Sequence, residues 1–142
     1  MSKSNALENA LLLLIFNATA FANMADNAAS SPVTNLYVSG HTADPGEAGD
    51  QTTSECAYTS YARVAVARSG AGWTVTGNSV VPAATISFPA CTGGTETMTH
   101  FGVGKLITTA GVLFYSGTVT PNIAISNGVT PQLTTATAIT ED

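Results

Sequence analysis

The stretch YARVAVARSGAGWTVTG, residues 61–77, decides the expected fold of this chain. Valine alternates with alanine in its first half, and apolar residues alternate with threonine in its second half. A period of two is the pattern of a β-strand with one buried face. The Ser-Gly-Ala-Gly run at residues 69–72 is rich in turn-forming residues. We therefore expect two strands here, separated by a turn.

The same period recurs along the chain after residue 32. We expect strands at residues 35–42, 61–68, 73–77, 84–88, 98–104, 112–120, 122–126 and 132–140. About eight short strands with turn residues between them predict a mainly β protein, an antiparallel β-sandwich over residues 33–142. The leading specific topology is a jelly roll. With an N-terminal α-helix at residues 1–20, the whole chain, residues 1–142, is expected to form a single domain.

The expected N-terminal helix is unusually apolar. In NALENALLLLIFNATAFANM, residues 5–24, the side chains of Leu7, Leu11, Leu14 and Ile15 recur at helical spacing and form one face. Neighbouring leucines widen this face so far that little of the helix can remain in water. We expect it to pack against the sheet or against a neighbouring subunit.

The same segment also has the parts of a secretory leader. Lys3 precedes an apolar run, and small residues follow at Ala18 and Ala20. If the chain were a secreted bacterial β-sandwich hydrolase or adhesin, this leader would be cleaved near Ala20 or Ala22. We expect instead that the helix is retained and that no signal peptide is cleaved. The run at residues 10–16 is shorter than the roughly 20 residues that span a bilayer, so no membrane partner is expected.

The charge of the chain is low and negative. Nine acidic residues against four basic ones give a formal net charge of −5 at pH 7. Because no basic surface is available to neutralise phosphates, we expect no nucleic-acid partner. Abundant hydroxyl and small side chains are typical of β-rich proteins whose neutral surfaces meet neighbouring subunits.

No motif for catalysis, metal binding or cofactor binding is present. The chain has no nucleophile elbow and no phosphate-binding loop, so we expect no enzyme activity and no cofactor. His41 and His100 lack further ligands at short spacing, so we expect hydrogen-bonded histidines at a sheet edge and no metal site. Cys56 and Cys91 form either one disulfide or two buried thiols, and we favour the thiols.

The acidic loop ADPGEAGDQTTSE, residues 43–55, is long for a compact domain, which favours contacts outside its own subunit. It lacks the calcium-binding pattern of an EF-hand. The two arginines of YARVAVAR either fix an acidic partner or pair internally with Glu55 or Asp50, and the sequence does not choose. The expected partner-contact residues are Leu7, Leu11, Leu14, Ile15, Asp44, Glu47, Asp50, Glu55, Arg63 and Arg68.

Several blocks together resemble a family of small tailed-bacteriophage virion proteins, often labelled tail fibre proteins. They are HTADPGEAG, YARVAV, THFGVG and LFYSGTVTPNIAISNGVTPQL, and the similarity covers nearly the whole chain. The resemblance implies a retained N-terminal helix and no catalytic residues. The chain departs from the family pattern at Gly40, where a larger aliphatic residue is usual, and at Cys56 and Cys91, where alanine is common.

The resemblance, the compact size and the absence of shaft repeats favour a structural virion protein made in the host cytoplasm. Our leading hypothesis is a capsid decoration (cement) protein on the capsid exterior, which binds the major capsid protein, stabilises the head and forms homo-oligomers. The alternative is a receptor-binding module associated with a tail fibre or tail tip, in which exposed Trp73, Tyr58 and Tyr61 would stack on host glycans.

Overall fold

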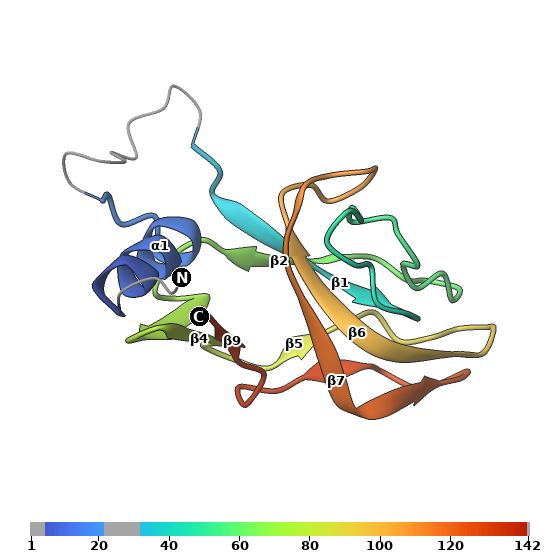
Figure 1. Cartoon of the computed structure of the whole chain (residues 1–142). Helices are drawn as coiled ribbons and strands as arrows, with labels where there is room; N and C mark the ends of the chain where they lie inside the picture. The colour runs from blue at the N-terminus through green and yellow to red at the C-terminus, as the bar shows by residue number, and fades with distance from the viewer. Residues whose placement is uncertain (1–4, 22–31, 142) are drawn as a thin grey trace. The chain divides into compact units, whose positions relative to one another are not determined.

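The computed structural model describes residues 5–21 and 32–141 (Figure 1). Its elements in chain order are α1 (Asn5–Asn17), β1 (Asn35–His41), β2 (Val64–Ala67), β3 (Trp73–Thr76), β4 (Ser79–Pro82), β5 (Ile86–Ser87), β6 (Glu96–Gly104), β7 (Leu113–Ile125), β8 (Gln132–Leu133) and β9 (Ile139–Thr140). The prediction of a mainly β protein with antiparallel pairing and an N-terminal helix is confirmed. The sandwich and the jelly roll stay predictions.

The chain forms two compact units, each built from separate stretches of sequence. The helix unit comprises Met1–Asn35, Val66–Thr85 and Leu133–Asp142, and the sheet unit comprises Leu36–Ala65 and Ile86–Gln132. The chain therefore passes between the units four times. The prediction of a single domain stays a prediction.

A tight hairpin organises the helix unit. β3 pairs with β4 in the register Thr76↔Ser79, so only Gly77 and Asn78 form the loop. Gly77 has a φ of 61°, a left-handed conformation that glycine adopts without strain. The Asn9 amide on α1 donates a hydrogen bond to the Gly77 carbonyl at 2.6 Å, which fixes the helix on the hairpin. β9 pairs with the other edge of β4.

The buried stripe of α1 differs from the predicted face. Glu8, Leu12 and Phe16 are buried at successive helical turns, and the Phe16 ring meets Trp73 edge to face at 4.8 Å. The predicted side chains of Leu11, Leu14 and Ile15 are only partly buried, and Leu7 is 36% exposed. The leucine run is apolar on every side, so its periodicity did not identify the side that packs.

The predicted boundaries of the helix also change. It ends at Asn17, because Ala18 takes a φ of 54° and leaves the right-handed helical region. Residues 1–4 of the predicted helix lie outside the described residues.

The sheet unit is organised around three strands, β1, β6 and β7, which pair over five or more residues. The strand order of the sheet is β2-β1-β6-β7, and β2 begins in this unit and continues into the helix unit. β1 pairs with β6 from Tyr37↔Gly104 to His41↔His100, and β6 pairs with β7 across the hairpin loop at residues 105–112. β5 and β8 form a separate two-stranded sheet. Figure 1 shows the long β6 and β7 ribbons running side by side.

Three strand predictions change in the structure. The two strands predicted at residues 112–120 and 122–126 are one strand, β7. Residues 132–140 contain two short strands, β8 and β9, in place of one long strand. β4 was not among the predicted strands. Pro82 lies at the end of β4, where a missing N–H is tolerated.

The contact between Phe16 and Trp73 gives the first testable prediction. Phe16→Ala should lower the free energy of unfolding of the helix unit by about 3–5 kcal/mol, because it leaves a cavity under α1. Denaturant unfolding followed by tryptophan fluorescence measures this, since Trp73 is the sole tryptophan. The control Leu7→Ala truncates an exposed leucine and should change stability by less than about 1 kcal/mol. Equal losses for the two variants would contradict this packing.

Candidate functional site

The segment between β1 and β2 contains the acidic loop, residues 43–55, in the sheet unit. Its two ends are joined, because the Thr42 amide donates to the Ser54 carbonyl at 2.8 Å. Within the loop, Asp50 accepts from the hydroxyl of Thr52 at 2.6 Å and from its amide at 2.8 Å. These hydrogen bonds lower the pKa of Asp50. Asp50, predicted to contact a partner, thus also shapes its own loop.

A buried glutamine ties the acidic loop to the β6–β7 hairpin loop. Gln51 donates from Nε2 to the Leu106 carbonyl at 3.1 Å and accepts from the Leu106 amide at 2.9 Å. It is fully buried, so this paired contact satisfies an amide that would otherwise be costly to bury. A Cβ at Gly104 or Gly111 would lie 2.3 Å or 2.2 Å from a Gln51 side-chain atom, so both glycines make its space.

An ion pair between the buried Arg63 and the partly buried Glu55 anchors the end of the acidic loop. Arg63 donates from Nε and Nη2 to the two oxygens of Glu55 at 2.6 and 2.8 Å, and from Nη1 to the Leu106 carbonyl at 2.9 Å. The Tyr61 hydroxyl donates to Glu55 at 2.8 Å and accepts from the Gly40 amide at 3.0 Å. The hydrogen bond to Glu55 raises the pKa of Arg63, and burial raises the pKa of Tyr61. Of the two alternatives for Arg63, the structure shows the internal pair with Glu55.

His41, the last residue of β1, also binds the acidic loop. Its Nδ1 lies 2.8 Å from the Thr53 carbonyl, which can only accept, so Nδ1 carries the proton. Nε2 then accepts from the Ser39 hydroxyl at 2.8 Å. Burial lowers the pKa of His41, which favours this neutral form. The predicted sheet-edge position is wrong, because His41 and its partner His100 lie on the inner strands β1 and β6.

Arg68 has a different role in the helix unit. It donates to the carbonyls of Ile15 at 2.6 Å, of Val33 at 3.1 Å, and of Leu14. Leu14 and Ile15 lie in the last turn of α1, where carbonyls lack helical partners and a cation is favourable. Burial lowers the pKa of Arg68. Its described contacts therefore cap the helix.

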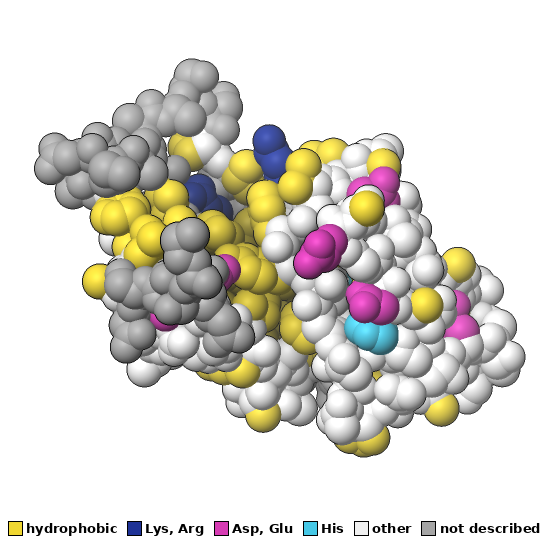
Figure 2. Space-filling view, in the orientation of Figure 1, with side chains coloured by type: hydrophobic (Ala, Val, Ile, Leu, Met, Phe, Trp, Pro, Cys, Tyr) yellow, Lys and Arg dark blue, Asp and Glu magenta, His cyan; other side chains and the backbone are white. Residues whose placement is uncertain are grey.

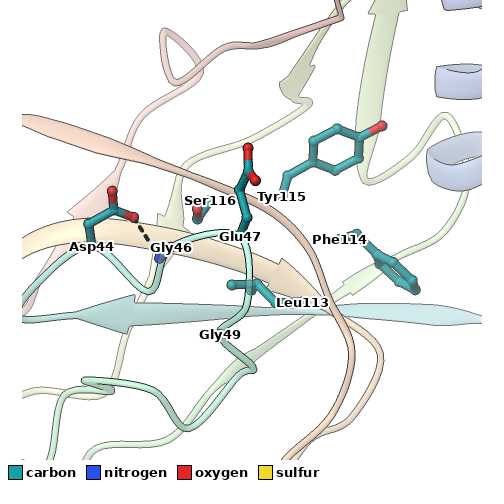
Figure 3. A pocket seen from close by; sticks show the side chains of 8 residues that line it. All are labelled: Asp44, Gly46, Glu47, Gly49, Leu113, Phe114, Tyr115 and Ser116. Carbon is teal, nitrogen blue, oxygen red and sulfur yellow. Dashed lines mark hydrogen bonds between the residues drawn. The ribbon is translucent and has the colours of Figure 1, made fainter.

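An open pocket of about 450 Å³ lies between the acidic loop and the start of β7 (Figure 3). Its lining residues are Asp44, Gly46, Glu47, Gly49, Leu113, Phe114, Tyr115 and Ser116. The carboxylate of Asp44 accepts from the Gly46 amide at 2.9 Å. Figure 3 shows the Glu47 side chain extending from the loop toward Ser116 and Tyr115. The structure thus brings two of the predicted contact residues, Asp44 and Glu47, to one pocket.

An apolar surface adjoins the pocket. Leu106, Ile107, Val112 and Phe114 are 40%, 55%, 61% and 40% exposed, and we call them the hairpin patch. Phe114 lies in a β-bulge, because Val103 pairs with Tyr115 while Gly104 pairs with Leu113. Such a bulge redirects the side chain of its extra residue. The sequence analysis missed this patch, although apolar residues on both sides of the Ala110–Gly111 turn were a signal for it.

The remaining surface of the sheet unit is weakly charged. On the face shown in Figure 2, acidic side chains form separate spots on a mostly uncharged surface. Trp73 and Tyr58, expected to stack on glycans, are buried, so this expectation is wrong for both. Within residues 5–21 and 32–141, no three His, Cys, Asp or Glu side chains are grouped to hold a metal ion.

Cys56 and Cys91 are both buried, and neither forms a disulfide. The preferred prediction of two free thiols is confirmed. Burial is the main cause that raises the pKa of Cys56 to about 12. Its thiol is therefore protonated and unreactive at neutral pH.

Comparison with known proteins gives one family. The family model described as Podophage GP4 fiber I protein gp80 matches residues 2–140. No curated protein matches the chain. No helix in the part of the chain that the structure describes is long and apolar enough to cross a membrane.

The ion pair between Arg63 and Glu55 gives a prediction about stability. Glu55→Gln should lower the free energy of unfolding by about 3–5 kcal/mol, because it leaves the Arg63 guanidinium buried without its counter-charge. Amide hydrogen exchange in β1 and β6 measures this loss in the sheet unit. The control Asn127→Asp changes an exposed turn residue away from this region and should leave exchange unaltered. Unchanged protection in Glu55→Gln would show that the pair does not support the sheet.

The cysteines give a prediction about reactivity. In the native chain at about pH 8, an aromatic disulfide reagent should modify neither thiol rapidly, because both are buried and the pKa of Cys56 lies well above that pH. In denaturant, both thiols should react at once. Absorbance of the released thiolate counts them, and the Cys91→Ala variant assigns the signal. A denatured chain that releases no thiolate before reduction would contain a disulfide.

Proposed function

Because the chain belongs to the family of Podophage GP4 fiber I protein gp80, we propose that it is a small structural subunit associated with a fibre of the phage tail. A phage fibre family is a family of virion components, so the chain is a structural protein of a bacteriophage particle. The family match over residues 2–140 carries this proposal, since it includes nearly the whole chain.

The contacts of the acidic loop support a structural role. Polar side chains of the sheet unit hold backbone in place: Gln51 and Arg63 bind the backbone of Leu106, and His41 binds the Thr53 carbonyl. Glu55 in turn pairs with Arg63. These bonds fix the loop against the hairpin. Asp44 and Glu47 then extend from a fixed surface, which lowers the entropy lost when a neighbouring protein binds. We propose that this surface contacts a neighbour in the particle.

A second candidate is a capsid decoration protein that binds the major capsid protein on the outside of the head. It is favoured by the compact elements of the described residues, whose one helix has 13 residues and whose strands have at most 13. A fibre shaft would show a repeated unit or a long coiled coil. A decoration protein gains avidity from many equivalent contacts on the capsid lattice, even when one contact is weak.

Copy number separates these two functions. Quantitative mass spectrometry of purified particles should give far fewer copies of this chain than of the major capsid protein if it belongs to a tail fibre. A simple whole-number ratio to the major capsid protein would instead support decoration of the head. A tail protein of known stoichiometry serves as the internal control. Absence of the chain from purified particles would contradict both candidates.

A further inference from the structure

The hairpin patch and the pocket form one continuous surface of the sheet unit. Val112 ends the hairpin loop, and the next residues, Leu113 and Phe114, line the pocket. Phe114 belongs to both features, because it is 40% exposed and also lines the pocket that Glu47 lines (Figure 3). Exposed apolar side chains next to polar groups are typical of protein–protein interfaces.

The surface also carries charges of both signs, one lysine and two carboxylates. Lys105 is exposed and lies across the hairpin loop from Val112, to whose carbonyl its amide donates at 3.2 Å. The other cation of the sheet unit, Arg63, is buried and forms an ion pair with Glu55. Glu47 is exposed, and within the described residues its carboxylate has no hydrogen-bond partner, whereas Asp44 accepts from Gly46. Lys105 and Glu47 are therefore the two charged groups of this surface whose side chains make no described hydrogen bond, and Asp44 adds a second negative charge beside Glu47.

We propose that this surface binds a second copy of the same chain through a two-fold contact. The hairpin patches of two copies pack on each other, and Lys105 of each copy meets Glu47 at the pocket of the other. In a two-fold interface, a residue that contacts a second residue is contacted by its equivalent in return, so one cation and one carboxylate per copy make two ion pairs. The surface is thus complementary to itself in both charge and apolar character.

The charges favour a second copy over an unrelated partner. A site for a strongly basic or acidic protein would carry one sign of charge, whereas this surface carries both signs around an apolar centre. A stable interface buries about 800 Å² on each partner. The hairpin patch supplies the apolar centre, and the loop at residues 44–49 with the exposed side of β7 supplies the polar rim. The inference does not depend on where in the particle the protein lies.

Charge exchange tests the contact. The full chain is purified, and its self-association is measured by sedimentation equilibrium. Lys105→Glu and Glu47→Lys should each weaken dimerisation about tenfold or more, because each places like charges together in both ion pairs. The double variant carrying both changes restores two opposite pairs, and its dissociation constant should return to within about threefold of the wild-type value.

The control Asn127→Lys adds a cation to the exposed turn after β7 and should leave dimerisation unchanged. Circular dichroism checks that each variant is folded. A wild-type chain that remains monomeric at millimolar concentration would overturn the proposal. So would single variants that dimerise normally, or a double variant as weak as the two single variants. If the chain does not self-associate but binds a different virion protein through this surface, the surface belongs to that partner instead.

Discussion

The carboxylate of Glu55 is the point on which the sheet unit depends. It accepts two hydrogen bonds from Arg63 and one from Tyr61, and through Arg63 it reaches the carbonyl of Leu106. Two neighbouring stretches, at Glu55 and Arg63, thus meet a distant one, at Leu106, through one charge pair. A buried charge without a partner is costly, so the end of the acidic loop, the start of β2 and the hairpin loop must take their positions together. The exposed surface formed by the loop and the hairpin follows from that requirement.

Local patterns were sufficient to predict the fold class, but they were insufficient to predict packing. The alternation in VAVA and WTVT identified β2 and β3, because strands with one wet face repeat every two residues. The leucine run identified α1, yet it gave no information on orientation, since a helix that is apolar all round can bury any side. Glu8 lies on the buried stripe although it was outside the predicted face, and Phe16, which only widened that face, is fully buried. The deciding contact, the ring of Trp73, is distant in sequence.

The candidate site was predictable only in part. The length and acidity of residues 43–55 identified the loop, and the pairing of Glu55 with Arg63 was one of two open alternatives. Gln51 could not have been found, because its role depends on the Leu106 backbone and on space left by two glycines far along the chain. The exposure of Phe114 depends on a bulge in β7. The alternation of residues in the sequence does not show where a strand pair has one extra residue.

Neither unit can be completed from one continuous piece of nascent chain. β3 and β4 leave the ribosome early, but β9, which covers the second edge of β4, comes from residues 139–140. During the interval, α1 has only a two-stranded hairpin to pack on, and such hairpins are marginally stable alone. The sheet unit combines residues 36–65, made before this hairpin, with residues 86–132, made after it. The helix unit therefore stays incomplete until residues 139–140 are made, and the apolar surface of α1 favours aggregation during that interval.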